Sequence, residues 1–101
     1  MRLLVFFDLP VGNSRQKRNY DRFRKKLLAK GLTAMQFSVY QRYCRSRAFA
    51  ESLATQLQEH LPPEGKVRFL LLPEQTFSQM KVFEDQEPVS PEEPPETFIL
   101  F

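Results

Sequence analysis

Short apolar runs that alternate with two amphipathic segments constrain the fold of this 101-residue chain more than any other feature. Residues 2–8 (RLLVFFD) are rich in Leu, Val and Phe and stop just before a Leu-Pro pair, which is typical of a strand. Residues 66–72 (KVRFLLL) form a similar run. Both alternating sets of side chains in these runs are largely apolar, so we expect both faces of each strand to need cover.

Residues 14–30 have the periodicity of a helix with one buried face. Its apolar side chains recur at three- and four-residue spacing and form a stripe of Tyr20, Phe23 and Leu27. Asn13 or Ser14 can cap the start of this helix, and Gly31 stands where a C-terminal glycine belongs. The segment is therefore predicted to be the first helix.

A second helix is expected from its cap at Ser46 to about Leu61, because Pro62 and Pro63 stop it. Its predicted stripe consists of Phe49, Leu53, Leu57 and Leu61. Between the helices, residues 32–44 are rich in Phe, Val, Tyr and Thr, which favours extended chain in two short strands. No Gly, Pro or Asn marks a turn there, so the boundary between these strands stays open.

The C-terminal part of the chain differs in composition from the rest. Residues 74–79 have the pattern of a short turn or helical loop, and residues 80–83 that of a fifth strand. Residues 84–97 hold four prolines and six acids, which is typical of a disordered or extended linker, and residues 97–101 are a candidate terminal strand. The predicted organisation is a domain at residues 1–83 and an acidic, Pro-rich C-terminal tail at residues 84–101.

The predicted element order is β-α-β-β-α-β. That order is the ferredoxin-like plan of an α/β (α+β) domain, with both helices on one face of an antiparallel sheet, here followed by a C-terminal extension. The helices then cover one sheet face, whereas the two apolar strands need cover on both. A second copy of the chain is the simplest cover for the other face, so we expect a homodimer.

The net charge of +3 conceals a strong asymmetry along the chain. Residues 1–83 hold all fifteen bases but only six of the twelve acids, and residues 15–30 hold eight bases against Asp21. A nearly single-signed face of this density favours a polyanion, and we expect nucleic acid; a solvated, solubilising surface is the alternative. The candidate nucleic-acid-binding residues are Arg15, Lys17, Arg18, Arg22, Lys25, Lys26, Arg42, Arg45 and Arg47.

Asp8 ends the first strand, in the alternating set that also holds Leu4 and Phe6. Carboxylates are depleted in strands and costly beside apolar neighbours. One explanation is that Asp8 caps the following loop by accepting backbone N–H bonds. The other is that Asp8 binds a hard cation, Mg²⁺ or Mn²⁺, with two copies facing each other across a dimer axis. Such a metal would polarise a phosphodiester and activate water, which makes Asp8 the candidate catalytic residue.

Several common site motifs are absent from the sequence. There is no P-loop, no G-x-G-x-x-G and no C-x-x-C, and the single cysteine, Cys44, excludes an intramolecular disulfide and is expected in the core. An RNA-recognition motif would share the element order, but residues 66–72 lack the glycine and paired aromatics that it requires. The N-terminal apolar run is too short for a signal peptide or a membrane span, so we expect a cytoplasmic protein without membrane contact.

Four sequence blocks lie in an order and spacing shared with a known family: MRLLVFFDLP, SRQKRNYDRFRKKLLAKGL, QFSVYQRYC and LPPEGKVRFLLLPEQTFSQMKVF. In these blocks, residues 1–83 resemble CRISPR-associated protein 2 in its short type II form. The resemblance implies a ferredoxin-like homodimer flanked by two dimers of the integrase, CRISPR-associated protein 1. It also implies that this assembly captures a short duplex and inserts it into the CRISPR array during spacer acquisition.

The resemblance implies an enzymatic alternative as well. Members of the family are described as Mg²⁺-dependent endoribonucleases or double-stranded DNases, and their proposed metal ligand corresponds to Asp8 in this sequence. In the family, nuclease activity looks dispensable for integration. Two functions are therefore expected as alternatives. One is a bridge that positions double-stranded DNA between integrase dimers, with RNA as the other candidate ligand. The other is a metal-dependent endonuclease acting through paired Asp8 residues.

Overall fold

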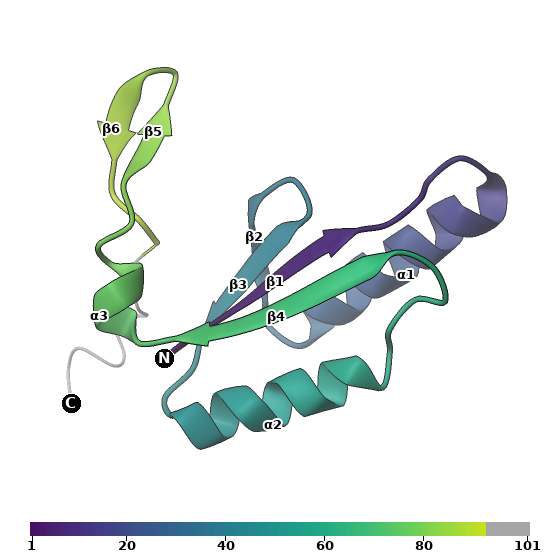
Figure 1. The fold of residues 1–101 in the computed structure, drawn as a ribbon, viewed down its shortest axis with the longest axis horizontal. Coiled ribbons are helices and arrows are strands. Elements are labelled where there is room, and N and C mark those ends of the chain that lie inside the picture. Colours follow the sequence, from purple (N-terminus) through teal and green to yellow (C-terminus); the bar gives the residue numbers. More distant parts are fainter. Residues whose placement is uncertain (93–101) are drawn as a thin grey trace.

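Strand β1 lies inside a four-stranded antiparallel sheet whose order is β2-β3-β1-β4 (Figure 1). The computed structural model describes residues 1–92. The strands of the sheet are β1 (Arg2–Asp8), β2 (Thr33–Gln36), β3 (Val39–Tyr43) and β4 (Lys66–Leu72). Asp8, at the end of β1, lies opposite Lys66 at the start of β4, so the two charged side chains share one end of the sheet.

Helices α1 (Ser14–Ala29) and α2 (Arg47–Gln58) both cover one face of this sheet, as Figure 1 shows. This arrangement confirms the predicted ferredoxin-like α/β plan. The side chains of Asn13 and Ser46 each accept a hydrogen bond from a backbone N–H of the first helical turn, so both helices begin at predicted caps. No helix among residues 1–92 is long and apolar enough to cross a membrane.

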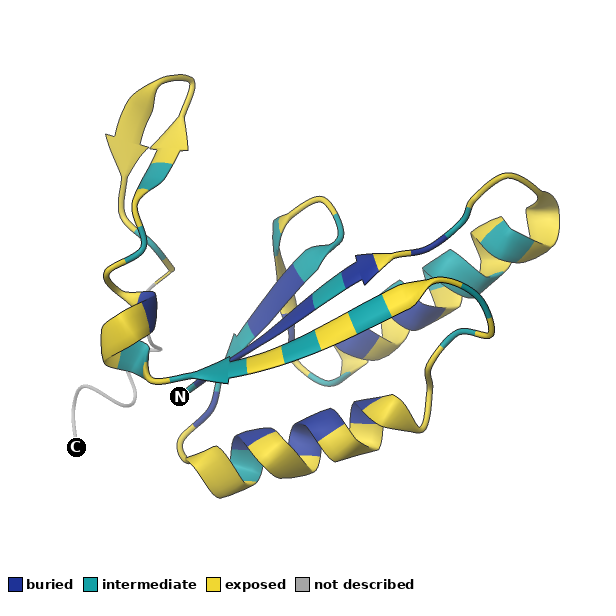
Figure 2. Ribbon diagram, in the orientation of Figure 1, coloured by how far each residue is buried: buried dark blue, intermediate teal, exposed yellow. Residues whose placement is uncertain are grey.

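Alternate residues of β1 point toward the helices and form the centre of the core. Leu3, Val5 and Phe7 are at most 6% exposed, and the Phe7 ring meets the edge of Phe23 from α1 with ring centroids 5.4 Å apart. Figure 2 shows buried positions along β1 and on the inner faces of both helices. Cys44 belongs to this core, as expected, and burial raises the pKa of its thiol.

Helix α2 ends earlier than the sequence predicts. Its last residue is Gln58, and Leu61 is 47% exposed, so Leu61 is not part of the buried stripe. The backbone N–H groups of Glu59 and His60 bond three residues back, which tightens the final turn. Pro62 supplies the physical reason, because the residue before a proline is driven out of the helical region.

The sheet face away from the helices is only partly apolar. On β1, Leu4 is 3% exposed and Phe6 is half-buried. On β4, however, the exposed side chains of Lys66 and Arg68 share this face with Leu70, which is 47% exposed. The expectation that this last strand is apolar on both faces is therefore wrong for its first half. We call this side of the sheet the open face.

After β4 the chain forms a short helix, α3 (Glu74–Phe77), and a separate hairpin of β5 (Val82–Glu84) and β6 (Glu87–Val89). The helical loop and the fifth strand are predicted by the sequence, but β6 lies where the sequence predicts a disordered or extended linker. The two turn residues, Asp85 and Gln86, have φ values of 51° and 71°, and this left-handed pair closes a two-residue hairpin. Figure 1 shows that the hairpin lies away from helices α1 and α2. The candidate strand at residues 97–101 lies outside the described residues.

Arg2 ties α3 to the sheet although its side chain is only 2% exposed. Its Nε donates to both carboxylate oxygens of Glu74, at 2.8 and 3.0 Å, and its guanidinium carbon lies 4.4 Å from the centroid of the Phe77 ring. Further N–H groups donate to the Gln41 side chain and to the Glu92 carbonyl. These charge-assisted and cation–π contacts hold the segment after β4 against the end of the sheet.

Candidate nucleic-acid interface

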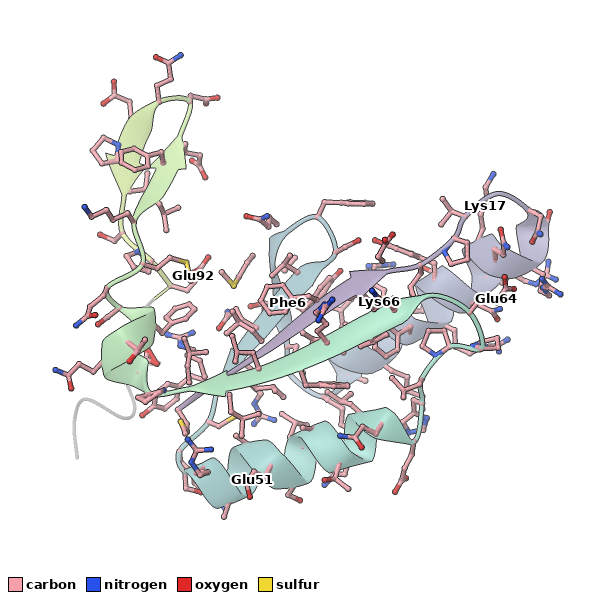
Figure 3. The ribbon with its side chains drawn as sticks, in the orientation of Figure 1. Phe6, Lys17, Glu51, Glu64, Lys66 and Glu92 are labelled. Carbon is pink, nitrogen blue, oxygen red and sulfur yellow. The ribbon has the colours of Figure 1, made fainter. Side chains whose placement is uncertain are left out.

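The outward face of α1 carries most of the predicted nucleic-acid-binding residues. Because Phe23 and Leu27 are buried, the side chains on the opposite side of this helix face solvent. The exposed bases along α1 are Arg15, Lys17, Arg18, Arg22, Lys25 and Lys26. Figure 3 places Lys17 near the amino-terminal end of the helix. The fold therefore gathers these six predicted residues on one element.

Acidic neighbours pair with only part of this set. Asp21 accepts from Lys25 and Arg24, each at 2.9 Å, and these hydrogen bonds, that from Lys25 first, hold the pKa of Asp21 below its usual value. Arg15 pairs with Glu64 at 2.8 Å. The exposed bases of α1 without an acidic partner within residues 1–92 are Lys17, Arg18, Arg22 and Lys26. We call these four side chains the free cations of α1.

The remaining predicted bases, Arg42, Arg45 and Arg47, lie near the start of α2. Arg42 is half-buried and donates at 2.9 Å to a backbone carbonyl just after α1. The guanidinium carbons of Arg42 and Arg45 lie 4.9 and 5.0 Å from the centroid of the Phe49 ring, and Arg47 pairs with Glu51 at 3.7 Å. Most of this second group is therefore engaged within the chain.

Two shallow surface hollows connect the groups of bases. One, of about 500 Å³, runs along α1 and is lined by Arg18, Asp21, Arg22, Lys25, Lys26 and Ala29. The other, of about 440 Å³, lies between the end of α1 and α2, includes Arg42 and Phe49, and also reaches Ala29. Of the second group, the structure thus brings Arg42 next to the bases of α1, at the end of that helix.

Asp8 lies apart from these bases, at the end of β1 on the open face. Its exposed carboxylate accepts no hydrogen bond within residues 1–92, so the loop-capping alternative is not supported. The backbone at Gly65 packs closely against the backbone of Asp8, because a Cβ at Gly65 would lie 2.6 Å from the Asp8 carbonyl oxygen. The Asp8 side chain borders a hollow of about 190 Å³ whose other lining residues include Phe37, Lys66 and Arg68.

A single chain supplies little of what a hard cation requires. No group of three or more Asp, Glu, His or Cys side chains within residues 1–92 can hold a metal ion. Mg²⁺ is coordinated by six oxygens and is usually bound through one or two carboxylates with water and phosphate. Asp8 offers one carboxylate, so a single chain supplies the fewest protein ligands with which Mg²⁺ is usually bound, and a second copy would add its own Asp8.

Sequence reasoning does not identify the neighbours of Asp8. Lys66 and Arg68 reach it through the antiparallel register of β1 and β4, and Phe37 through the turn between β2 and β3. Figure 3 shows Phe6 and Lys66 on these neighbouring strands of the sheet. No local sequence signal marks this grouping, because strand register is set by contacts between distant segments.

Comparison with known proteins gives a consistent result over most of the chain. Residues 1–80 match the family described as CRISPR associated protein Cas2. A protein of Flavobacterium psychrophilum named CRISPR-associated endoribonuclease Cas2 is 36% identical over 98% of this chain and 86% of its own length. A protein of the same name from Acidovorax ebreus is 44% identical over 81% of this chain and 80% of its own length.

A solved structure has the same fold. The crystal structure of Streptococcus pyogenes Cas2 at pH 6.5 superimposes with a TM-score of 0.62, covering 83% of this chain and all of that chain at 18% sequence identity. The β-α-β-β-α-β sheet, the family match over residues 1–80 and the similarity to named relatives agree. This chain therefore belongs to the CRISPR-associated protein Cas2 family.

Proposed function

We propose that this protein acts in spacer acquisition as a homodimer that bridges two dimers of the integrase, CRISPR-associated protein 1, and holds the duplex DNA to be inserted into the CRISPR array. The observation that carries the proposal is the row of free cations on α1, Lys17, Arg18, Arg22 and Lys26. Arg and Lys contacts to phosphates give affinity without base readout, as a captured duplex of arbitrary sequence requires.

The open face supports the homodimer. Helices α1 and α2 leave this side of the sheet uncovered, and it carries the partly exposed apolar side chains of Phe6, Val39 and Leu70. An uncovered apolar sheet face of this kind is typical of an interaction surface. A second copy would bury it through a self-complementary contact and would place the two basic helices on the outside of the dimer.

The DNA contact is tested by comparing two variants that each lose one positive charge, one on α1 and one outside it. Arg22→Gln removes a free cation of α1, whereas Lys81→Gln removes an exposed base outside α1. We expect Arg22→Gln to weaken duplex binding by the complex with the integrase by about 1 kcal/mol, and Lys81→Gln to leave it nearly unchanged. Equal effects of the two substitutions would show that the α1 bases are only a solvated surface.

The second candidate function is a Mg²⁺-dependent endonuclease that acts through Asp8. The observation in its favour is that the Asp8 carboxylate is exposed and has no hydrogen-bond partner within residues 1–92, while Lys66 and Arg68 border the same hollow. Two such carboxylates brought together by a dimer axis repel unless a cation lies between them. A divalent ion held there would polarise a phosphodiester of RNA or DNA, and the relatives' name of endoribonuclease agrees with this chemistry.

A further inference from the structure

Asp21 is the one acidic residue of α1, whose 16 residues include seven bases. A helix brings side chains together when they are three or four residues apart. Bases occupy all four of these positions around Asp21, namely Lys17, Arg18, Arg24 and Lys25. A carboxylate in the middle of a basic helix is therefore the nearest anion to several cations of the candidate interface.

The Asp21 carboxylate is engaged by the two bases that follow it on the helix. Its Oδ1 accepts from Arg24 at 2.9 Å, and its Oδ2 lies 2.9 Å from Nζ of Lys25. Arg24 is half-buried and also interacts with the Tyr40 side chain, so it is held toward β3. The Lys25 side chain is 68% exposed. Lys25 is therefore the cation that Asp21 keeps from an outside phosphate.

Asp21 also lines the surface hollow of about 500 Å³ along α1, together with three of the free cations of that helix. Its side chain is 46% exposed, so the negative charge meets the solvent beside these bases. The hydrogen bonds from Lys25 and Arg24 hold the pKa of Asp21 below its usual value, so the carboxylate is ionised at neutral pH. A phosphate that enters the hollow is attracted by the free cations but repelled by Asp21.

We propose that Asp21 is a built-in competitor of DNA phosphates: it occupies Lys25 in the free protein, weakens duplex binding on α1 and speeds release of the duplex. A cation that first has to leave a carboxylate gains less from a phosphate than a free cation does. While no DNA is bound, the same carboxylate offsets the mutual repulsion of the surrounding bases. This inference rests on the proposed function, because a duplex that is captured and then inserted has to be released.

A purely structural role is the competing explanation of this acid. An acid four residues before a lysine stabilises a helix slightly. In that role Asp21 would hold Lys25 ready for a phosphate, and its removal would weaken duplex binding. The exposure of Asp21 within the hollow favours competition instead, because its carboxylate meets the side from which a phosphate arrives. The two explanations predict changes of opposite sign when the charge of Asp21 is removed.

Binding of one DNA duplex by the complex with the integrase tests the proposal. Asp21→Asn removes the charge, Asp21→Glu keeps it, and Asp85→Asn makes the same chemical change in the hairpin, away from α1 (Figure 1). We expect Asp21→Asn to tighten binding by about tenfold at about 0.1 M salt, and to raise the slope of log affinity against log salt concentration by about 0.9, as for one additional cation. Most of this gain should be slower dissociation of the duplex. Asp21→Glu and Asp85→Asn should bind as the wild type does.

The outcomes separate this inference from the proposed function. Unchanged or weaker binding by Asp21→Asn, in a complex that remains sensitive to Arg22→Gln, overturns the inference alone and assigns Asp21 a structural role. Equal tightening by Asp21→Asn and Asp85→Asn also overturns it, because net charge would then set the affinity. Binding that is insensitive to Arg22→Gln overturns the proposed function and this inference with it, since the duplex would not lie on α1.

Discussion

Asp8 ends β1 with an exposed carboxylate that accepts no hydrogen bond within residues 1–92. A structural role for this side chain would require partners, and the described part of the chain provides none. Its neighbours Lys66 and Arg68 border the same hollow, where they would be the first cations to meet a phosphate. Asp8 is therefore the residue at which the bridging and nuclease functions make different demands.

We expect Asp8→Asn to change the free energy of unfolding by less than about 0.5 kcal/mol, as for an exposed side chain without partners. If paired Asp8 residues hold Mg²⁺, the same substitution abolishes divalent-dependent cleavage of RNA or DNA by the purified protein, because the amide is a poor ligand for a hard cation. Spacer integration stays intact, because bridging needs shape and positive charge. Asp85→Asn at the tip of the hairpin is the matched control and leaves both activities unchanged.

Loss of integration by a folded Asp8→Asn protein that still binds the integrase would contradict this separation of functions. The sequence alone singles out Asp8, because a carboxylate at the end of an apolar strand is unusual. It does not single out Arg2, which is indistinguishable from a surface base until Gln41, Glu74 and Phe77 converge on it from distant elements. Burial of a charge depends on such non-local partners, which local pattern does not reveal.

Elements with strong local signals match their predictions closely. Both helices begin at the predicted caps, Asn13 and Ser46, and β4 has the predicted bounds of residues 66–72. The differences arise where the signal is weak or tertiary. Leu61 fits the helical period but precedes a proline and lies outside the helix. Strand β6 forms because Asp85 and Gln86 adopt a left-handed backbone conformation, and no glycine in the sequence marks this turn.

The attachment of α3 to the sheet predicts a stability effect at Glu74. Glu74→Ala removes the carboxylate whose two oxygens accept hydrogen bonds from the buried Arg2 side chain. We expect this substitution to lower the free energy of unfolding by about 1–3 kcal/mol. The matched control is Glu51→Ala, which removes an exposed pair with Arg47 at 3.7 Å and should cost less than about 0.5 kcal/mol. Urea unfolding of the two variants measures the difference, and equal midpoints would show that Arg2 does not anchor α3.

At the scale of the whole molecule, helices α1 and α2 lie on one side of the sheet (Figure 1), with the exposed bases on α1, and the partly apolar open face lies on the other. In the proposed function, α1 meets duplex DNA and the apolar part of the open face meets a second copy. The sequence predicts the division from the periodicity of residues 14–30 and from the apolar runs, but it overestimates how apolar β4 is. The Lys66 and Arg68 side chains confine the apolar part of the open face to the other end of that strand.

The homodimer is tested by placing a charge on the open face. Leu70 and Leu61 are both 47% exposed, but only Leu70 lies on the open face. We expect light scattering at micromolar concentration to give about twice the chain mass of 12.0 kDa for the wild type and for Leu61→Glu. Leu70→Glu should shift the protein toward the monomer, because a buried unpaired carboxylate is costly at an interface. A wild-type protein that stays at 12.0 kDa would contradict the dimer.

The salt dependence of duplex binding by the complex with the integrase tests the DNA-holding role most directly. Each cation that neutralises a phosphate contributes about 0.9 to the slope of log affinity against log salt concentration. Arg18→Gln combined with Arg22→Gln should therefore reduce that slope by about 1.8 and weaken binding by about 1–3 kcal/mol at low salt, while assembly with the integrase is unchanged. If the slope and the affinity of the double variant equal those of the wild type, the duplex does not lie on α1.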